Sequence, residues 1–507
     1  MLHDWFIRSV EKYPDEPALI ADGRQFSYAE LDGISRSIGH RLLAEGVDRP
    51  RIGLLSTRTV ETYAAYLAGL RIGGVVVPLD PAHPADRLAV VARSAGLDFV
   101  VADDTADAAL LDALPARVVR VESPSASDTT AGSASRDSLP DWTGNPDDLA
   151  YLLFTSGSTG QPKGVPIRHG NVDPFIDLNV ARYGMEPGCR HSQMFSLTFD
   201  LSVFDMFVTW GSGAALVVPS ADDLYDPVEF VNKHRLTHWF CVPSLVSMAT
   251  RARLLSPGCM PSLRWSLFCG EQLTLNQAQA WAEAAPNSTL ENLYGPTELT
   301  VAMTSYRLPK ERGAWPATSN GTVPIGAVYP HLDFQIDPES GELQVRGSQR
   351  FHGYHDAKDN EGRFIEPALP QPGSDRPEPG PEAWYRTGDR IALENGILVH
   401  LGRLDHQVKI RGYRIELPEI ESAMRMWAGV DDAIVHAVAH LDGQLELAAA
   451  CTGDVPSGRE LRKLLRPHLP DYMIPTRIAA LDGLPVNDRG KTDRTACAGL
   501  LQKRFAR

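Results

Sequence analysis

A run of small hydroxyl residues and glycines follows an apolar segment in the first third of the chain. Residues 155–160 read Thr155, Ser156, Gly157, Ser158, Thr159 and Gly160, and Lys163 stands three residues further on. Small residues let backbone N–H groups approach an anion closely, hydroxyls donate to phosphate oxygens, and a lysine adds a point charge. The segment is therefore suited to holding a triphosphate. Clusters of this composition also form ordinary loops, so the segment alone does not decide between the two.

The spacing excludes one class of nucleotide-binding protein. A Walker A loop requires a glycine, four variable residues, and then Gly-Lys-Ser or Gly-Lys-Thr. Here Pro162 precedes the lysine and Gly164 follows it. The chain is therefore not expected to be a P-loop NTPase.

Length and composition exclude several further classes of protein. The chain has 507 residues, too many for one core, so at least two domains are expected. The net charge of −15 argues against a nucleic-acid partner. The six cysteines contain no Cys-x-x-Cys pair, which argues against a zinc site or a disulfide framework and favours a reducing compartment. Neither a signal-peptide core nor an apolar run of membrane-spanning length occurs. These features predict a cytoplasmic enzyme with no membrane partner.

Strand and helix patterns alternate along the chain, which indicates parallel sheets with helical crossovers and an α/β fold. The expected strands before residue 300 are 25–28, 51–55, 74–78, 99–102, 117–121, 151–154, 214–219, 238–243, 265–270 and 290–295. Residues 334–337 and 342–346 are expected to pair as antiparallel strands. From residue 402 a small α+β module is expected, with a strand at 407–416, a helix at 418–426, a strand at 433–438 and a helix at 458–469. We therefore predict a large multi-sheet N-terminal domain, 1–401, and a small C-terminal domain, 402–507.

Four further motifs follow the first one in order. They are residues 294–298 (Tyr-Gly-Pro-Thr-Glu), 385–389 (Tyr-Arg-Thr-Gly-Asp), 402–414 (Gly-Arg-Leu-Asp-His-Gln-Val-Lys-Ile-Arg-Gly-Tyr-Arg) and 487–494 (Asn-Asp-Arg-Gly-Lys-Thr-Asp-Arg). Together the five motifs resemble the adenylate-forming superfamily, which includes acyl-CoA synthetases, luciferases and the adenylation domains of nonribosomal peptide synthetases. Residues 198–205 resemble the branch that activates amino acids. The resemblance covers almost the whole chain.

The resemblance implies a two-step reaction, in which a carboxylate attacks the α-phosphate of ATP and a thiol then takes the acyl group. It implies a C-terminal domain that rotates about a hinge at Asp405. Lys491 matches the catalytic lysine of the first step, and Glu298 matches the catalytic carboxylate that holds Mg²⁺. A cation is needed because negative charge develops on the phosphate oxygens. The remaining matches to the ATP site are Thr155 to Gly160, Lys163, Gly270, Glu271, Asn292, Leu293, Tyr294, Thr297, Asp389 and Arg403.

The resemblance also places an acid beside the amino group of the substrate. Asp200 matches this residue, and a buried anion is needed because a bare ammonium is costly to desolvate. The other matching pocket positions are Leu201, Phe204, Cys241, Leu267, Cys269, Leu293, Val301 and Ala302. None of them is charged, so a small apolar side chain is expected. Residues 199–203 and 267–271 are similar to D-alanine–carrier protein ligases, and prolyl–carrier protein ligases have a similarly apolar pocket; alanine ranks first and proline second.

No phosphopantetheine attachment motif follows Lys491, so we expect the enzyme to load a separate carrier protein in trans. Residues 402–507 contain 16 Lys and Arg against 14 Asp and Glu, whereas the rest of the chain contains 33 against 50. Arg459, Arg462, Lys463 and Arg466 should share one helix face, and we interpret this face as a docking site for an acidic carrier or as an ordinary solvated surface.

Two other interpretations remain open. An acyl-CoA synthetase acting on a simple carboxylic acid would share the motifs, but it has no reason to bury Asp200. A catalytically silent ATP-binding regulatory protein would not need Lys491, Glu298 and Asp389 together.

Overall fold

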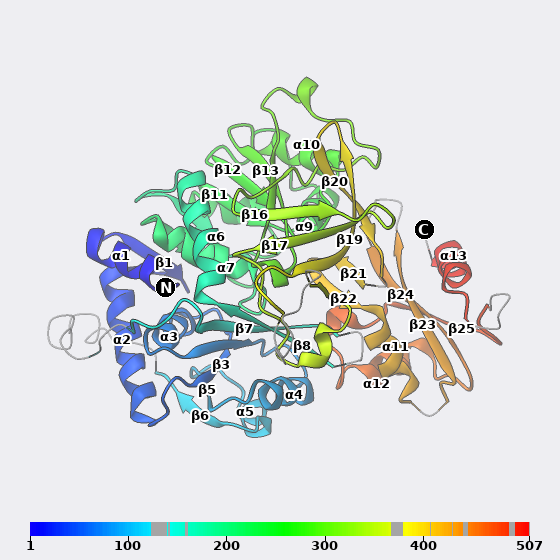
Figure 1. The fold of residues 1–507 in the computed structure, drawn as a ribbon, viewed down its shortest axis with the longest axis horizontal. Coiled ribbons are helices and arrows are strands. Elements are labelled where there is room, and N and C mark those ends of the chain that lie inside the picture. Colours follow the sequence, from blue (N-terminus) through cyan, green and yellow to red (C-terminus); the bar gives the residue numbers. More distant parts are fainter. Residues whose placement is uncertain are drawn as a thin grey trace.

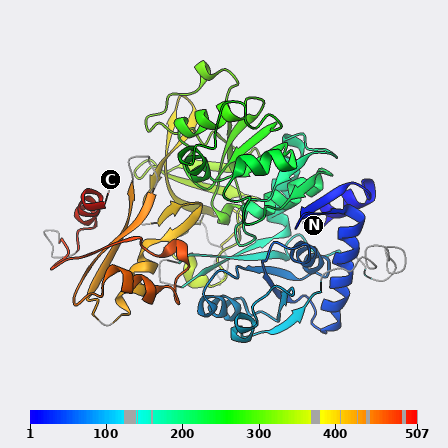
Figure 2. The same ribbon diagram turned by 180° about the vertical axis from the view of Figure 1, so that it is seen from behind.

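The computed structural model describes residues 1–122, 139, 142–157, 161–366, 379–405, 407–427, 429–439, 445–485 and 492–505. Within these ranges the chain forms five sheets, three before residue 404 and two after it. Figure 1 shows the segment after β20 set to one side of the larger body, and Figure 2 shows the same division from behind. The architecture is α/β, with a large N-terminal and a small C-terminal part, as predicted.

The first sheet has six strands in the order β6-β5-β3-β4-β7-β8. All its neighbours are parallel except β7 and β8. Its strands are β3 (Arg51–Leu55), β4 (Val75–Leu79), β5 (Phe99–Ala102), β6 (Arg117–Arg120), β7 (Leu149–Thr155) and β8 (Lys163–Arg168). The helices along this stretch are α2 (Tyr28–Ala44), α3 (Val60–Arg71), α4 (Ala85–Ala95) and α5 (Ala108–Ala113). The parallel centre confirms the predicted helical crossovers.

The second sheet has nine strands in the order β15-β14-β13-β12-β11-β9-β10-β1-β2, with a parallel centre and antiparallel edges. Its strands are β1 (Pro17–Ala21), β2 (Arg24–Ser27), β9 (Arg190–Ser192), β10 (Ala215–Val217), β11 (His238–Cys241), β12 (Trp265–Phe268), β13 (Thr289–Tyr294), β14 (Thr304–Arg307) and β15 (Ala327–Val328). Its helices are α1 (Asp4–Lys12), α6 (His169–Arg182), α7 (Leu201–Gly211), α8 (Pro227–His234), α9 (Pro243–Arg251) and α10 (Leu275–Ala284), with short 3₁₀ turns η1 (Thr297–Leu299) and η2 (Arg312–Ala314).

Two buried helices join these sheets. Every residue of α3 is buried, and so is α7 from Leu201 to Trp210. α3 packs on β3 and β4, α7 packs on β9 and β10, and the rings of Tyr66 and Phe207 lie 5.9 Å apart. Both helices are rich in apolar residues on every face, and such helices are stable only where other elements cover them on all sides.

The third sheet is antiparallel and leads to the second part of the chain. It contains β16 (Leu332–Ile336), β17 (Glu342–Gly347), β18 (Phe364–Ile365), β19 (Trp384–Glu394) and β20 (Ile397–Arg403), with η3 (Ala357–Asn360) between β17 and β18. The pairing of β16 with β17 confirms the predicted antiparallel strands. β20 pairs with β19 as far as Arg403, so residue 402, the predicted boundary, lies inside a strand of this sheet.

The C-terminal part has its own sheets and its own hydrophobic core. It contains the pair β21 (Gln407–Ile410) and β22 (Tyr413–Glu416), and the sheet β23 (Asp432–Ala439), β24 (Leu445–Thr452) and β25 (Arg477–Ala480). The helices are α11 (Leu417–Arg425), α12 (Gly458–Leu465) and α13 (Arg494–Phe505), with η4 (Asp471–Met473). The predicted helix at 458–469 is therefore too long, because α12 ends at Leu465.

The prediction of one strand over residues 407–416 is wrong. Residues 407–416 form a hairpin, because Arg411 and Gly412 both have positive φ, 54° and 80°. Two consecutive positive φ values are those of a type I′ turn, whose twist matches that of paired strands. The alternation of apolar and polar residues, which led to the prediction of one long strand, continues on both sides of this turn.

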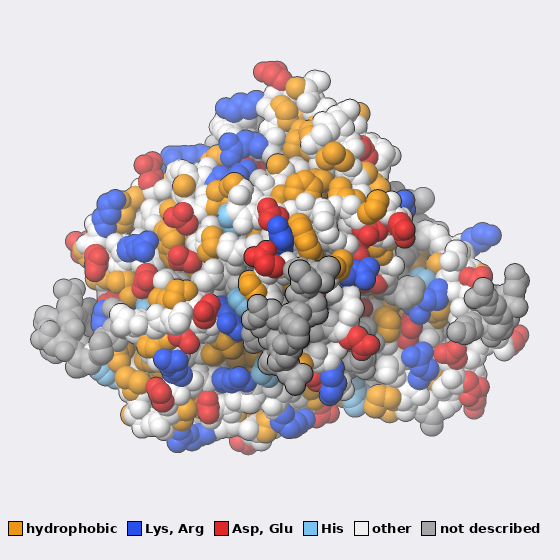
Figure 3. All heavy atoms as spheres, in the orientation of Figure 1, with side chains coloured by type: hydrophobic (Ala, Val, Ile, Leu, Met, Phe, Trp, Pro, Cys, Tyr) orange, Lys and Arg blue, Asp and Glu red, His pale blue; other side chains and the backbone are white. Residues whose placement is uncertain are grey.

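A local sequence signal marks the start of α2. The Ser27 hydroxyl accepts from the backbone N–H of Glu30, and the Glu30 carboxylate accepts from the Ser27 N–H at 2.8 Å, so the two residues form a capping box at the start of α2. Residues 123–138, which are rich in Ser, Thr, Ala and Asp, lie outside the described residues, as does most of the Pro-rich stretch 366–382. On the face in Figure 3, acidic and basic side chains are interspersed.

Candidate functional site

The predicted site residues gather around two adjoining cavities between the large and small parts. The first is lined by the ends of β4, β7 and β12, by the start of α7 and by the β21–β22 hairpin. The second is lined by Gly270 to Gln272, Asn292 to Tyr294, Thr322 and Val323, and by β20 and β21. Ligands of open α/β sheets bind outside the carboxyl ends of the strands, where this first cavity lies.

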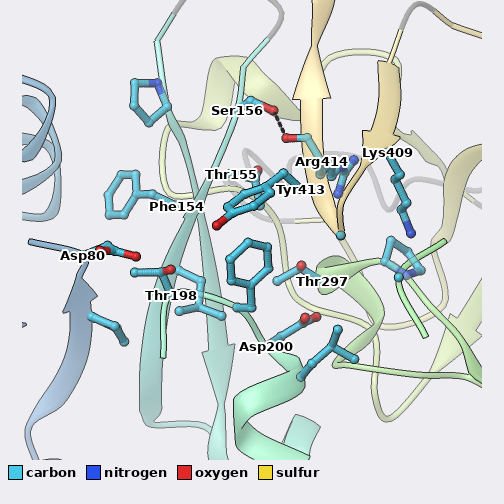
Figure 4. Close-up of a pocket in the computed structure, with 18 of the residues that line it drawn as sticks. Asp80, Phe154, Thr155, Ser156, Thr198, Asp200, Thr297, Lys409, Tyr413 and Arg414 are labelled. Atoms are coloured by element: carbon cyan, nitrogen blue, oxygen red, sulfur yellow. Dashed lines mark hydrogen bonds between the residues drawn. The ribbon is translucent and has the colours of Figure 1, made fainter. Parts of the chain in front are cut away.

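The phosphate-loop residues contact the C-terminal part. The Ser156 hydroxyl donates to the backbone oxygen of Arg414 at 2.7 Å (Figure 4). The same hydroxyl accepts from the Glu416 N–H at 3.2 Å. The Gly157 N–H donates to Glu419 at 3.3 Å. Thr155 lines the first cavity, whereas Ser158, Thr159 and Gly160 lie outside the described residues. Lys163 is buried and pairs with Asp359 at 3.2 Å.

Glu298 is fully buried in η1. Its carboxylate accepts from the Tyr354 hydroxyl at 2.6 Å, and the Nη1 atom of Arg414 lies 2.9 and 2.7 Å from its two oxygens. Burial alone would raise its pKa, but the Arg414 guanidinium and these hydrogen bonds lower the pKa to about 2. Glu298 therefore remains ionised at neutral pH.

A single ionised carboxylate fits one mode of Mg²⁺ binding. Mg²⁺ takes oxygen ligands and is often held by one or two carboxylates together with substrate phosphates. The described residues contain no group of three or more His, Cys, Asp or Glu side chains that could hold a metal. A Mg²⁺ ion at Glu298 would bind this carboxylate together with oxygens of a phosphate substrate.

Asp389 lies on β19 at the junction of the two cavities. It accepts hydrogen bonds from the Tyr294 hydroxyl at 2.7 Å, from Nη1 of Arg403 at 3.1 Å and from Nε2 of His400 at 3.0 Å. Burial opposes ionisation, but the hydrogen bond from His400 and the charge of Arg403 hold the pKa of Asp389 well below its usual range. The same Arg403 binds both oxygens of Asp405, at 2.8 and 2.6 Å.

Five of the predicted ATP-site residues line the second cavity, namely Gly270, Glu271, Asn292, Leu293 and Tyr294, and Thr297 lines the first. The Asn292 amide donates to the backbone oxygens of Val323 and Pro324, at 3.2 and 2.9 Å. The Glu271 carboxylate accepts from the N–H of Ser244 and from the N–H of Gly412, both at 2.9 Å. Glu271 thus connects this cavity to the turn of the β21–β22 hairpin.

Asp200 lies in the first cavity at the start of α7, beside Thr297 (Figure 4). Its side chain makes no capping bond to the helix, although it occupies the N-cap position. Burial raises the pKa of Asp200 to about 6, and the Thr297 hydroxyl and the charge of Lys409 partly oppose this rise. An acid that is buried without a capping role and faces a cavity is suited to binding a cation.

The other predicted pocket positions separate into two groups. Leu201, Cys269 and Val301 line the first cavity and Leu293 the second. Phe204, Cys241, Leu267 and Ala302 are buried and are not among the described residues that line either cavity. The Phe204 ring packs against Phe240 at 4.9 Å and Tyr183 at 5.6 Å. Burial raises the pKa of both Cys241 and Cys269, to about 12 for Cys269, so both thiols are neutral.

Several polar side chains in the site were given no role from the sequence. Lys409, Tyr413 and Arg414 enter the first cavity from the hairpin, and Figure 4 shows all three above Asp200. Tyr413 stacks on Tyr472 with ring centroids 3.7 Å apart and packs edge-on against Phe199 at 5.0 Å. The signal that could have located them is the Arg-Gly pair at 411–412, which marks a turn inside an apparent strand. The predicted catalytic Lys491 lies outside the described residues.

Comparisons with known proteins agree with this geometry. The family model of AMP-binding enzymes matches residues 6–355. An L-proline–[L-prolyl-carrier protein] ligase of Pseudomonas fluorescens is 32% identical over 98% of this chain and 99% of its own length. The phosphinothricin tripeptide synthetase PhsC of Streptomyces viridochromogenes is 34% identical over 98% of this chain, and tyrocidine synthase 3 of Brevibacillus parabrevis is 31% identical over 98%. The chain spans only 45% and 7% of the lengths of these last two relatives.

Solved structures of full-length similarity also exist. The adenylation domain AlmE of Vibrio cholerae, solved in complex with glycyl-adenosine-5′-phosphate, has a TM-score of 0.83 and 27% identity, with 99% of this chain and 98% of that chain covered. IdnL7 has a TM-score of 0.70 and 36% identity, with 100% and 99% covered. The chain therefore belongs to the family of AMP-binding enzymes, which form acyl-adenylates. Among the described residues, no helix is both long and apolar enough to cross a membrane.

Proposed function

We propose that this protein uses ATP to activate a small apolar α-amino acid and then loads it onto a separate carrier protein. In the first step a carboxylate oxygen of the amino acid bonds to the α-phosphorus, and the bond to the bridging oxygen of the β-phosphate breaks, which releases pyrophosphate. In the second step the sulfur of a phosphopantetheine thiol bonds to the acyl carbon, the thiol proton leaves, and AMP departs.

The observation that carries this proposal is the placement of Asp200. Its buried carboxylate faces the first cavity, which also contains Thr155, Ser156 and Asp389. A substrate with an α-ammonium group would supply Asp200 with a counter-charge inside the cavity, whereas a simple carboxylic acid would supply none. This favours an amino-acid ligase over an acyl-CoA synthetase.

The roles of the other residues follow from their positions and their motifs. Asp389 is suited to accept from the ribose hydroxyls, with Arg403 beside it, and residues 155–160 with Lys163 are suited to the phosphates. When bound at Glu298, Mg²⁺ would neutralise phosphate charge. Lys491 is assigned to the first step from its motif alone. We also propose that residues 1–401 and 402–507 rotate relative to each other about Asp405 between the two steps.

The expected size of the substrate follows from the predicted pocket positions that line the first cavity. These are Leu201, Cys269 and Val301, which are buried and uncharged, so a small apolar side chain suits them. An alanine-like substrate is therefore our first choice. Proline is the second, because a relative matched over 99% of its length is an L-proline ligase.

Amino-acid-dependent ATP–pyrophosphate exchange tests the proposal. The full chain should exchange with a small apolar amino acid from a panel of both enantiomers, and Asp200→Asn should raise the KM for that amino acid by roughly 30-fold or more, as expected when one partner of a buried charge pair is removed. Asp107→Asn is the matched control, because Asp107 only caps α5 and asparagine caps equally well. Exchange with acetate or propionate, but with no amino acid, would support an acyl-CoA synthetase instead; no exchange at all would support a silent ATP-binding protein.

A further inference from the structure

Two consecutive residues beside the first cavity have a left-handed backbone conformation. Thr300 has a φ of 55° and Val301 a φ of 71°, directly after η1. Both residues are β-branched and buried. A β-branched residue with positive φ is sterically strained, because its Cβ approaches the backbone too closely. Such a segment keeps this conformation only where the surrounding structure holds it.

The side chain of Gln349, two residues after β17, holds this segment. Gln349 is fully buried, and its amide nitrogen donates to the backbone oxygens of Leu299, Thr300 and Ala302, at 3.0, 3.1 and 2.9 Å. The Thr300 hydroxyl in turn donates to the backbone oxygen of Gln349 at 2.7 Å. One amide therefore binds carbonyl groups on both sides of Val301.

Hydrogen-bond chemistry fixes the orientation of this amide. Backbone oxygens only accept, so the atom that faces these three carbonyl groups is the nitrogen. The amide oxygen of Gln349 then faces Nε2 of His331, and because this oxygen also only accepts, His331 donates. His331 directly precedes β16, which pairs with β17. The ring and the amide are therefore held at the same end of one antiparallel pair.

The turn after β17 is itself fixed from the other side. The Asn171 amide on α6 donates to the backbone oxygens of Ser348 and Arg350, at 2.9 and 3.0 Å. The Phe351 N–H donates to the backbone oxygen of Glu298 at 2.9 Å. This turn is therefore a rigid base from which a side chain can constrain the residues that follow Glu298.

We propose that Gln349 is a positioning residue for the substrate pocket, because its amide holds residues 299–302 in the strained conformation that places Val301 at the first cavity. This inference rests on the proposed function for the nature of the substrate. Gln349 is not among the described residues that line either cavity, so it acts through Val301 and not by contact with the substrate. Without the amide, three buried carbonyl groups lose their donor, and the segment relaxes toward negative φ.

Hydrogen exchange of the full-length, substrate-free protein, measured by mass spectrometry, tests the hold on the segment. The reporters are three hydrogen-bonded N–H groups, those of Thr300, Ala302 and Met303. Gln349→Met keeps a side chain of similar length but no N–H donor, so the reporters should exchange about tenfold faster or more. Gln344→Met is the matched control, because Gln344 is also buried, lies on β17 and binds Gln335 instead. It should leave the reporters unchanged.

Glycine at position 300 separates positioning from a general structural role. Glycine adopts positive φ without strain, so adding Thr300→Gly to Gln349→Met should restore slow exchange of the reporters, even though the amide is absent. Thr300→Gly alone should not accelerate their exchange. If Gln349→Met does not fold, His331→Phe replaces it, because this change at a half-buried position removes only the donor to the amide oxygen. Its effect should have the same direction and be smaller.

The same variants are then compared in ATP–pyrophosphate exchange with the carboxylic substrate that the wild type prefers. Gln349→Met should raise the KM for this substrate about tenfold or more, because a displaced wall misplaces the substrate. The KM for ATP should stay nearly constant, because Val301 is not among the described residues that line the second cavity. Adding Thr300→Gly should lower the raised KM again.

Unchanged exchange of the reporters in a folded Gln349→Met or His331→Phe variant would overturn the proposal. So would failure of Thr300→Gly to restore slow exchange, or an equal rise of both KM values, which would indicate a general distortion. The hydrogen-exchange experiment uses no substrate. A wild type that accepts no amino acid therefore counts against the proposed function, and the hold of Gln349 on the segment is still decided by the reporters.

Discussion

The imidazole Nε2 of His400 lies 3.0 Å from Oδ1 of Asp389, across the antiparallel pair β19–β20. The Gln272 amide nitrogen donates both to Nδ1 and to the backbone oxygen of His400, at 3.0 and 2.8 Å. Because Nδ1 accepts, Nε2 carries the proton and donates to Asp389. His400 thus orients the carboxylate that we assign to the ribose.

Replacing His400 with phenylalanine should weaken ATP binding. A hydrogen bond to a charged group contributes about 1.5–3 kcal/mol, so the KM for ATP should rise roughly 10- to 100-fold while the KM for the amino acid stays nearly constant. His400→Gln, which keeps a donor, should recover part of the loss. Initial rates of ATP–pyrophosphate exchange at varied ATP measure this. An equal rise in both KM values would indicate a general distortion of the site.

Amino-acid binding should depend on pH through Asp200. Its pKa is about 6 because of burial, and only the ionised carboxylate attracts the substrate ammonium. Below pH 6 the kcat/KM for the amino acid should fall about tenfold per pH unit, and above pH 7 it should be flat. The KM for ATP should not follow this profile, because the pKa of Asp389 is held low. A flat amino-acid profile between pH 5 and 8 would refute this assignment of Asp200.

The raised pKa of Asp200 also means that its ionised side chain destabilises the folded protein. The folded state binds the Asp200 proton more tightly than the unfolded state, so the free energy of unfolding decreases as pH rises from about 4 through about 6. Asp200→Asn removes this cost and should raise the free energy of unfolding of the substrate-free protein at pH 8 by on the order of 1–3 kcal/mol. Thermal scans at pH 8 and pH 4 should show a higher Tm for the variant only at pH 8. The same shift at both pH values would point to a cause other than ionisation.

Lys491 should separate the two half-reactions. If it stabilises charge only in the first step, Lys491→Ala should slow adenylation by about 10²–10³-fold or more and leave transfer from supplied aminoacyl-adenylate to the carrier intact. ATP–pyrophosphate exchange measures adenylation, and single-turnover transfer to a radiolabelled carrier measures the second half-reaction. Loss of both half-reactions to the same extent is the outcome that contradicts the assignment.

The basic face of α12 is expected to steer the carrier. Leu461 and Leu465 are fully buried, whereas Arg459 and Lys463 are exposed on the opposite face. Arg462 donates to the backbone oxygen of Thr476 at 2.8 Å, so it is left unchanged. Arg459→Glu with Lys463→Glu should slow loading of an acidic carrier, more strongly at low salt, without changing carrier-free exchange.

The control for this experiment uses the same spacing elsewhere on the surface. Arg8→Glu with Lys12→Glu places two reversals four residues apart on α1, where both positions are exposed. Loading by the control should match the wild type. If the α12 variant also matches the wild type at low ionic strength, the carrier docks on another surface.

Local sequence signals determined most of the elements and the location of the chemistry. The Ser27–Glu30 capping box and the apolar strands that end in small residues act over a few residues, through hydrogen bonds and side-chain alternation, so they can be read without the fold. The ordered motifs likewise identified Asp200, Glu298 and Asp389 as candidates. Their types and neighbours carry this information before any contact is known.

Which groups meet was decided only by the tertiary structure. The alternation of residues 407–416 concealed a turn, and the positive φ of Arg411 and Gly412 brings Arg414 onto Glu298, 116 residues earlier in the chain. The same packing buries Asp200 at the first cavity, which raises its pKa, and places Phe204 in a cluster of aromatic rings. Charge pairing of this kind depends on burial and on distance in space, and neither is encoded by spacing along the sequence.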